Sequence, residues 1–423
     1  MLDVAIVGGG LCGLALAHSL RARRVDWTLF EARPRLGGRV LSTPAGHGPG
    51  PPLDLGPTWF WPATQPSITR LVADLGLATL PQADDGRVNL LDDPNRAPRA
   101  LAFDATTGRL AADASTPAQP GALHSGAHRL AGGMAALVDA LAARLPADRL
   151  QRGRVLQALI DHGEQVELQF LHDGEPQQIR ARRVVLALPP RLAAASLRFN
   201  PPLPEPLASA MAATPTWMAS AAKAAVRCAQ PIWRGRPGVG NAWVTHPQAV
   251  LAEVFDAGPA DATQGAALAG FVALGAAQRP AFRRGLPMLI DSQLAMLFGN
   301  ELGATEPQLL DWADEPFTCT ETDRQEDARS GAHPTYGDPT LQQPLWDGRL
   351  WLGGSETARH GGGYLEGALA AAARLRLRLT AAANDGPPVA AAADGDIAAA
   401  PAPASPPGAP SGLAPTTLAY PGA

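Results

Sequence analysis

The sequence has few cysteines and only one lysine. Its three cysteines, Cys12, Cys228 and Cys319, are odd in number and widely separated, so they provide neither a disulfide framework nor the spacing of a metal site. We therefore expect no bound metal and a reducing compartment, the cytoplasm. Every other basic residue is arginine, and the single exception, Lys223, raises the question of what arginine could not do at that position.

Positive charge and long apolar runs are also scarce. The formal net charge is -4 at pH 7, which leaves no electrostatic footprint for nucleic acid. No run approaches the ~20 apolar residues that span a bilayer, so we expect no membrane segment. The chain starts directly with an expected strand, without a charged region before an apolar stretch, so we expect no signal peptide.

The length allows two domains with a large core. Residues 2–7 and 27–30 are expected strands and residues 11–23 an expected helix, a βαβ start typical of a parallel sheet. The C-terminal residues lack large apolar side chains, and we predict that they are disordered. The predicted boundaries are 1–80, 128–200 and 330–382 for a discontinuous first domain, 81–127 and 201–329 for a second, α+β domain, and 383–423 for an alanine- and proline-rich tail.

Further elements follow from periodicity and from glycine and proline positions. Residues 84–127 have weak periodicity and are interpreted as an excursion out of the first domain. The expected helices are 134–145, 287–298 and 365–379. The expected strands are 154–156, 165–171, 184–188, 221–227, 269–274 and 349–352.

Gly8, Gly10 and Gly13 form a GxGxxG fingerprint between an expected strand and an expected helix. Gly8 permits a tight turn, Gly10 lets the backbone approach a pyrophosphate, and Gly13 allows close packing of helix on strand. The helix N-terminus offers N–H groups and partial positive charge to phosphates. Glu31 ends the next strand and would accept hydrogen bonds from ribose hydroxyls. The pattern predicts a dinucleotide, and FAD and NAD both fit it.

Several segments resemble the flavin-dependent amine oxidases, a family that includes monoamine, L-amino-acid and polyamine oxidases. The resemblance covers residues 1 to about 380, and its closing segments are specific in both order and spacing. It implies a glutathione-reductase-like α/β fold whose Rossmann domain binds FAD, with a second domain for the substrate. The resembling segments are 31–39, 53–59, 129–134 with Val155, 184–190, 354–358 and 363–368.

The resemblance also implies which residues hold FAD besides the fingerprint glycines and Glu31. Arg39 would reach the pyrophosphate, Val155 the adenine end, and Trp312 would pack on the flavin. A helix starting near Gly363 would direct its positive N-terminus at charge that develops on the reduced flavin. The implied set is Cys12, Ala32, Arg33, Gly38, Arg39, Gly56, Pro57, Thr58, Trp59, Val155, Trp312, Gly354, Ser355, Glu356, Gly363, Tyr364, Leu365 and Ala368.

Lys223 lies in an apolar strand and resembles the family's active-site lysine, which holds a water near flavin N5. An ammonium is a compact hydrogen-bond donor with three protons, and its pKa changes on burial. A guanidinium is larger and planar, and it keeps its charge. We therefore predict a catalytic role for Lys223. The alternative is an incidental strand lysine whose ammonium reaches water.

The segment after Trp312 departs from the monoamine oxidases. Counting forward, the position of their flavin-linked cysteine falls on Glu321, and Cys319 lies two residues before it. We therefore expect noncovalent FAD, with Cys319 as a competing attachment point.

The same count places Thr322 at the first tyrosine of the family's aromatic cage. Tyr364 matches the second, and we assign it a role at the substrate. Other aromatic residues are alternatives for the missing wall, or ordinary core residues: Trp59, Phe60, Trp61 and Trp243.

The predicted function is amine oxidation. Hydride would pass from the α-carbon of a small amine to flavin N5, giving an imine and, with O2 as electron acceptor, hydrogen peroxide. Two alternatives remain open: a related flavoenzyme that oxidises carbon–carbon bonds, and a noncatalytic flavin-binding module. The particular amine and the oligomeric state are not determined by the sequence.

Overall fold

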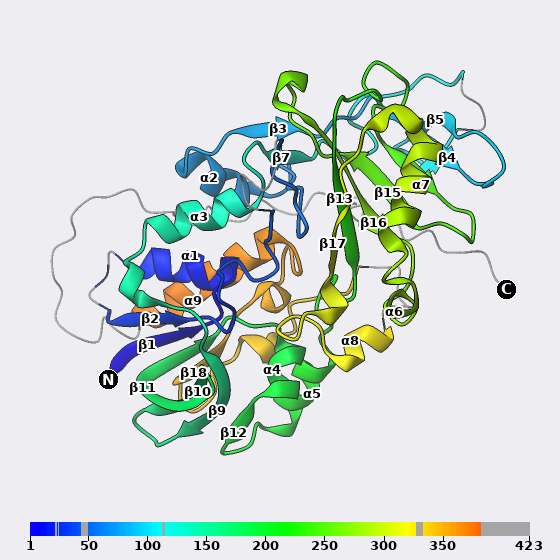
Figure 1. Cartoon of the computed structure of the whole chain (residues 1–423). Coiled ribbons are helices and arrows are strands. Elements are labelled where there is room, and N and C mark those ends of the chain that lie inside the picture. Colours follow the sequence, from blue (N-terminus) through cyan, green and yellow to red (C-terminus); the bar gives the residue numbers. More distant parts are fainter. Residues whose placement is uncertain (22, 24, 44–49, 112–114, 327–332, 382–423) are drawn as a thin grey trace. The chain divides into compact units, whose positions relative to one another are not determined.

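The computed structural model describes residues 1–21, 23, 25–43, 50–111, 115–326 and 333–381 (Figure 1). These residues group into two compact units. The predicted tail, 383–423, lies outside the described residues. Unit 1 contains Met1–Arg35, Arg144–Thr214 and the described residues from Thr335 onward, and unit 2 contains Leu36–Ala143 and Pro215–Pro334.

The compact units depart from the predicted domain boundaries. Residues 36–80 and 128–143, expected in the first domain, group with unit 2, whereas 201–214 group with unit 1. One reason is packing, because Leu53 and Leu55 join a buried cluster with strand residues of unit 2. The functional division into FAD and substrate domains stays a prediction.

Unit 1 is built on one sheet whose strands follow the order β12-β9-β10-β11-β1-β2-β8, with β18 also paired to β11. Residues 4–7 of β1 are an apolar run that is buried throughout, as expected for a strand with parallel neighbours on both sides. The strands are β1 Leu2–Val7, β2 Trp27–Phe30, β8 Leu150–Gln151, β9 Val155–Asp161, β10 Val166–His172, β11 Glu175–Leu186, β12 Arg198–Asn200 and β18 Leu350–Leu352.

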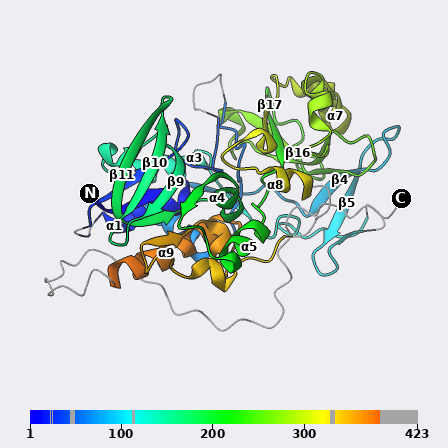
Figure 2. The same ribbon diagram turned by 90° about the horizontal axis from the view of Figure 1, so that it is seen from below.

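Two helices from opposite ends of the described chain, α1 and α9, pack side by side in unit 1 (Figures 1 and 2). Helices α4 and α5 form a second pair. The core contains Val7, Phe30, Leu168, Val184 and Met211, all nearly inaccessible to water. The helices are α1 Leu11–Leu20, α4 Pro190–Ser196, α5 Glu205–Ala213 and α9 Leu365–Ala381, with short 3-10 turns at Ala147–Arg149, Pro339–Gln342 and Ser355–Thr357.

Unit 2 has a sheet of order β17-β13-β16-β15-β14-β4-β5-β6 and a separate β3-β7 pair. The strands are β3 Thr79–Pro81, β4 Arg87–Leu91, β5 Arg99–Asp104, β6 Arg109–Leu110, β7 His128–Leu130, β13 Ala222–Cys228, β14 Ala242–Val244, β15 Leu251–Asp256, β16 Ala266–Val272 and β17 Gln308–Asp311. The helices are α2 Pro66–Asp74, α3 Ala135–Ala143, α6 Arg279–Phe282, α7 Leu286–Phe298 and α8 Glu321–Glu326, with 3-10 turns at Ala262–Gln264, Asn300–Leu302 and Trp312–Asp314.

The two faces of the unit 2 sheet are covered differently. Helix α7 packs through Ile290 and Leu294 on the face that carries Ala224 and Val226. Side chains alternate along a strand, so Lys223 and Ala225 point to the other face, where Ala225 packs against Leu53 and Leu55. The loop 53–59 therefore covers the side of the sheet on which Lys223 lies.

Most expected elements are present with shifted ends. The expected strand 184–188 is wrong in extent, because β11 starts at Glu175 and its first half pairs with β10. Residues 84–127 contain β4, β5 and β6, which the weak periodicity did not indicate. Their side chains pack locally, with Val88, Phe103 and Leu123 in a small cluster of their own.

Candidate functional site

The turn from β1 to α1 forms a glycine cradle. Gly8 has a φ of +111°, and a Cβ added to Gly13 would lie 2.0 Å from the Gly8 carbonyl oxygen, so both positions need glycine. Gly10 occupies the N-cap in extended conformation, and no acidic residue lies in the first turn of α1. This helix N-terminus presents N–H groups and positive charge to an anion, as phosphate sites do.

Glu31 lies at the end of β2, next to the cradle, and is almost fully buried. Its Oε2 accepts a hydrogen bond from the Gly9 N–H at 2.7 Å, and Oε1 accepts one from the Arg33 N–H at 2.9 Å. Each carboxylate oxygen has a further lone pair for a ribose hydroxyl. The Arg154 N–H donates to the Glu31 carbonyl, which sets Val155 at the start of the neighbouring strand. Unit 1 thus gathers Gly8, Gly10, Gly13, Glu31, Ala32, Arg33 and Val155.

The distant Gly354 segment reaches the same cradle. The Gly354 N–H donates to Cys12 Sγ at 3.3 Å, and a Cβ added to Gly353 would lie 3.4 Å from that sulfur. Burial raises the pKa of the Cys12 thiol to about 11, so it stays protonated and acts as a packing group. Ser355 and Glu356 follow directly, and Ser355 Oγ donates to Glu356 Oε2 at 2.8 Å. The structure therefore unites the two signatures that the sequence separates by more than three hundred residues.

The loop before α9 is shaped by glycine. Gly361 and Gly363 have φ values of +63° and +79°, and the Tyr364 N–H donates to the Gly361 carbonyl at 3.0 Å. Burial raises the pKa of Tyr364, which keeps its phenol protonated. Leu365 and Ala368 are buried on the first turn of α9. A Cβ on Gly362 would lie 2.4 Å from the Cβ of Tyr336, a contact that sequence reasoning missed.

In unit 2, the predicted residues around Arg39 and Gly56 pack together. Gly38 has a φ of +57°, and Arg39 Nη1 donates to the Trp217 carbonyl at 3.1 Å. A Cβ added to Gly56 would lie 2.1 Å from the Arg39 carbonyl oxygen. The segment Gly56, Pro57, Thr58 and Trp59 is therefore held against the Arg39 loop.

Lys223 is a deeply buried charged side chain, with 2% of its surface exposed. Its Nζ donates to the Gly56 carbonyl at 2.9 Å and to Thr58 Oγ1. Nζ also lies 5.4 Å from the ring centre of Phe255 and 5.6 Å from that of Phe271. Burial lowers the pKa of Lys223 to about 8, against the opposing effect of nearby carboxylates. An incidental lysine reaching for water does not match this environment.

Glu253 belongs to the same face and was missed from sequence. The β13-β16-β15 register pairs Lys223 with Phe271, and Phe271 with Glu253, so the three residues form one row across the sheet. Burial raises the pKa of Glu253 to about 7, and the Lys223 charge opposes that rise. A charged residue in an apolar strand was the available signal, but only the strand pairing connects it to Lys223.

Trp312 is 5% exposed and lies beside the same segment. Its Nε1 donates to the Leu55 carbonyl at 2.9 Å, and its backbone N–H donates to the Ala221 carbonyl at 2.9 Å. Trp312 thus links the loop 53–59 to the strand of Lys223. Whether its ring packs on a flavin stays a prediction.

Of the four candidate cage walls, Trp59 contacts the Lys223 cluster. Its ring lies 4.5 Å from that of Phe255 and 6.4 Å from that of Phe271. Phe60 packs on His128, Trp61 Nε1 donates to the His124 carbonyl, and Trp243 packs edge-on against Phe103. Glu321 and Thr322 are exposed on α8. Noncovalent attachment of FAD stays a prediction.

Comparison with known proteins decides the family. Residues 122–375 match the model of the flavin containing amine oxidoreductases, and residues 6–75 match that of NAD(P)-binding Rossmann-like domains. The chain belongs to the flavin-containing amine oxidoreductase family. It is therefore a flavin-dependent oxidoreductase, as the sequence predicted.

The chain is 25% identical over 459 residues to amine oxidase [flavin-containing] B of Sus scrofa, covering 88% of this chain and 85% of the relative. A putative flavin-containing monoamine oxidase, AofH, of Mycobacterium tuberculosis is 40% identical over 86 residues, 20% of this chain and 18% of the relative. Cyclohexylamine oxidase from Brevibacterium oxydans superposes with a TM-score of 0.70 at 17% identity, covering 91% and 99% of the two chains. Wild-type putrescine oxidase bound to putrescine superposes with a TM-score of 0.68 at 20% sequence identity, covering 90% of this chain and 99% of the putrescine oxidase chain. These likenesses confirm the predicted fold.

The residues of this family member fit a flavin dinucleotide. Side chains at Gly8 or Gly13 would fill the cradle, and Glu31 keeps lone pairs for a ribose. Among the described residues, no group of three or more histidine, cysteine, aspartate or glutamate side chains is arranged to hold a metal ion. In the same part of the chain, no helix is both long and apolar enough to cross a bilayer.

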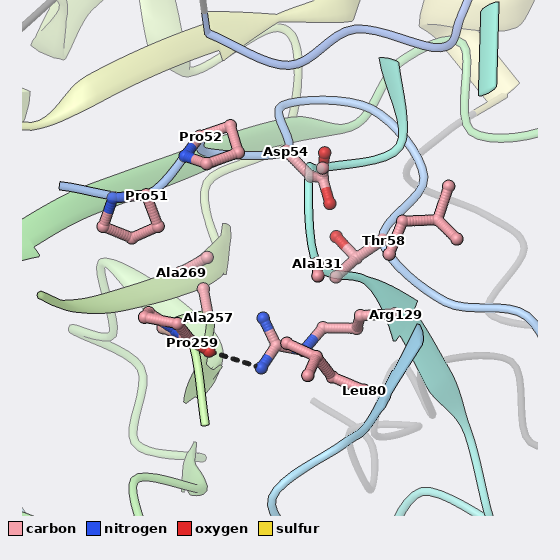
Figure 3. A pocket seen from close by; sticks show the side chains of 13 residues that line it. Pro51, Pro52, Asp54, Thr58, Leu80, Arg129, Ala131, Ala257, Pro259 and Ala269 are labelled. Carbon is pink, nitrogen blue, oxygen red and sulfur yellow. Dashed lines mark hydrogen bonds between the residues drawn. The ribbon is translucent and has the colours of Figure 1, made fainter. Parts of the chain in front are cut away.

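A small pocket lies near Lys223 within unit 2 (Figure 3). Arg129 extends into it from β7, and Asp54 and Thr58 line it from the loop 53–59. Thr58 is also the hydrogen-bond partner of Lys223. Arg129 appeared in the sequence only as part of a family-like segment, without a role.

Proposed function

We propose that this family member binds FAD noncovalently and oxidises a small amine, with O2 as electron acceptor. The observation that supports this most is the buried Lys223, bonded to the segment 56–58 that the resemblance associates with the flavin. When bound, FAD would accept hydride from the amine α-carbon, giving an imine that water hydrolyses and, with O2, hydrogen peroxide.

The nucleotide part would be held by unit 1. The first-turn N–H groups of α1 would bind the pyrophosphate, since Gly10 has no side chain to occupy them. Glu31 would accept hydrogen bonds from the ribose hydroxyls. Each of its carboxylate oxygens keeps a lone pair that is not used by the Gly9 or Arg33 N–H group. Noncovalent attachment predicts that acid precipitation of the purified protein leaves all the flavin in the supernatant. A yellow precipitate would instead indicate attachment at a cysteine such as Cys319.

Lys223 would hold a water and a proton. Two of its three Nζ protons are directed at Gly56 and Thr58, which leaves one for a water. Its pKa of about 8 lets Nζ exchange that proton near neutral pH, which an arginine cannot do. Tyr364, protonated by burial, would offer its ring as a wall for a neutral amine.

A turnover screen of monoamines, polyamines and amino acids with a peroxide readout tests the function. Cyclohexylamine and putrescine belong in the panel, because two structural relatives are named as their oxidases. The expected result is peroxide release and anaerobic bleaching of the flavin by at least one amine. A flavin that no amine bleaches would contradict the proposal and favour a noncatalytic flavin-binding module.

Lys223→Met tests the residue assignment. We expect slower flavin reduction or reoxidation in stopped-flow experiments, with Lys223→Arg failing to restore the rate because a guanidinium retains its proton. Unchanged rates in both half-reactions would remove Lys223 from the mechanism. The family match favours amine over carbon–carbon oxidation, and a cytoplasmic location stays a prediction.

A further inference from the structure

Glu253 is a carboxylate without a cationic partner. Among the described residues, no hydrogen-bond donor or basic group pairs with its side chain, and the residue keeps part of its surface exposed. Burial nevertheless raises the pKa of its carboxyl group to about 7, and the charge that opposes this rise is that of Lys223. Glu253 has therefore lost much of its water without gaining a donor from the protein. A carboxylate in this condition is stabilised by a cation from outside the chain.

The register of the unit 2 sheet places Glu253 in one row with Lys223. Lys223 of β13 pairs with Phe271 of β16, which pairs with Glu253 of β15. Glu253 pairs in turn with Trp243 of β14. Directly paired residues of antiparallel strands present their side chains on the same face, with Cβ atoms roughly 5 Å apart. The row therefore runs from a buried ammonium across an aromatic ring to a carboxylate, and ends on a second aromatic ring.

The row is covered at its Lys223 end and more open beyond it. Lys223 is bonded to the segment 56–58 and is 2% exposed, whereas Phe271, Glu253 and Trp243 are each partly exposed. Neighbouring strands lie about 4.8 Å apart, so Lys223 and Glu253, two strands apart, are separated by roughly 10 Å at the backbone. This is the length scale of a short aliphatic chain with a polar group at each end.

The rings on both sides of Glu253 suit an organic cation. An ammonium that lies against the carboxylate gains further attraction from the face of an adjacent ring, and tryptophan gives the strongest interaction of this kind. Phe271, between Lys223 and Glu253, offers apolar surface to methylene groups, which leave water when they pack on it. A fitting ligand therefore has a cationic end at Glu253 and an apolar chain that runs towards Lys223.

We propose that Glu253 binds the distal ammonium of a diamine whose other amine, in its neutral form, is oxidised beside Lys223. The inference rests on the proposed function, because it names the substrate class of the same site. The carboxylate would accept charge-assisted hydrogen bonds from the distal ammonium, and Phe271 would contact the methylene groups between the two amines. A monoamine of the same chain length lacks the distal group and leaves the carboxylate unpaired, so it is the poorer substrate.

Steady-state kinetics of the full-length, flavin-loaded protein with diamines and monoamines of equal chain length test the proposal, starting from putrescine and butylamine. We expect the best diamine to exceed its monoamine in kcat/KM by roughly tenfold or more, the effect of a charge-assisted hydrogen bond. Glu253→Gln should remove most of this preference by raising KM for the diamine, without slowing the monoamine. Glu301→Gln, which removes an exposed glutamate of the same unit, is the matched control and should keep the preference of the wild type.

Glu253→Asp supplies a readout that a merely structural role would not change, and it keeps the test decisive if Glu253→Gln does not fold. It retracts the carboxylate by one methylene group, so the preferred diamine should become the next longer homologue, while the order among monoamines stays the same. Equal kcat/KM for diamines and monoamines in the wild type would overturn this inference and leave amine oxidation intact, as would an unchanged preference in Glu253→Gln. A flavin that neither class of amine reduces would instead contradict the proposed function, and this inference with it.

Discussion

Replacing Lys223 with methionine should change how the stability of the protein depends on pH. The fall in the pKa of Lys223 from its ordinary 10.5 to about 8, caused by burial, corresponds to about 3 kcal/mol. At pH 7 the buried ammonium carries this cost. Its bonds to Gly56 and Thr58 offset it, at about 1.5–3 kcal/mol for each hydrogen bond to a charged group. The variant should therefore unfold at pH 7 within about 2 kcal/mol of the wild type.

The difference in the free energy of unfolding between the wild type and Lys223→Met changes as the pH rises, in favour of the wild type. Between pH 8 and 10.5 the unfolded chain keeps the Lys223 proton while the folded protein has released it, so the unfolded state binds more protons. The free energy of unfolding of the wild type therefore rises with pH in this window, by about 3 kcal/mol in full, relative to Lys223→Met. Below pH 8 both the folded and the unfolded wild type keep the Lys223 proton, so Lys223 itself adds no pH dependence to the free energy of unfolding there.

Guanidinium unfolding at several pH values from 7 to 10, with excess FAD in every sample, measures this difference. Arg284→Met serves as the control. An exposed arginine stays charged over the whole pH range, so its replacement should leave the pH dependence of the free energy of unfolding unchanged. A constant difference between the wild type and Lys223→Met across the range would refute the lowered pKa. The environment that we assign to Lys223 would then be wrong as well.

Three further substitutions test the site and the core. Gly13→Ala should abolish flavin binding at a cost of about 1–3 kcal/mol in stability, because its Cβ would lie 2.0 Å from the Gly8 carbonyl; purified protein with normal flavin absorbance would contradict this. Glu31→Gln should weaken FAD binding about tenfold in a fluorescence titration, since an amide offers one acceptor in place of two; an unchanged Kd would count against a ribose contact. Trp233→Phe should lower the free energy of unfolding by about 1–3 kcal/mol, because it removes the 2.8 Å bond to buried Asp256; an unchanged denaturation midpoint would show that this bond contributes little.

The nucleotide cradle was predictable because its requirements are local. The turn at Gly8 and the helix–strand approach at Gly13 depend on backbone conformation within a few residues, and glycine is the residue that both allow. The same holds for the loop of Gly361 and Gly363 before α9. Glu31 was found because it follows the second strand at the spacing of a βαβ unit.

The surroundings of Lys223 were only partly predictable. Its single occurrence and its place in an apolar strand indicated a role, and the family resemblance indicated which one. Glu253, Phe255 and Phe271 were missed because their relation to Lys223 arises from the register of three strands that are distant in sequence. Arg129 was seen as part of a motif, but its burial and its hydrogen bond from Nη2 to the Gly258 carbonyl are visible only once the chain is folded.

The sequence by itself determined the family, the flavin and the two ends of the nucleotide site, because turns and helix starts depend on neighbouring residues. Only the tertiary structure decided which side chains surround Lys223 and that Arg129 and Thr58, far apart in sequence, line one pocket. Burial and charge balance depend on every strand and loop packed around a group. The spacing of residues along the chain does not specify how deeply a group is buried or which charges surround it, so both become visible only in the tertiary structure.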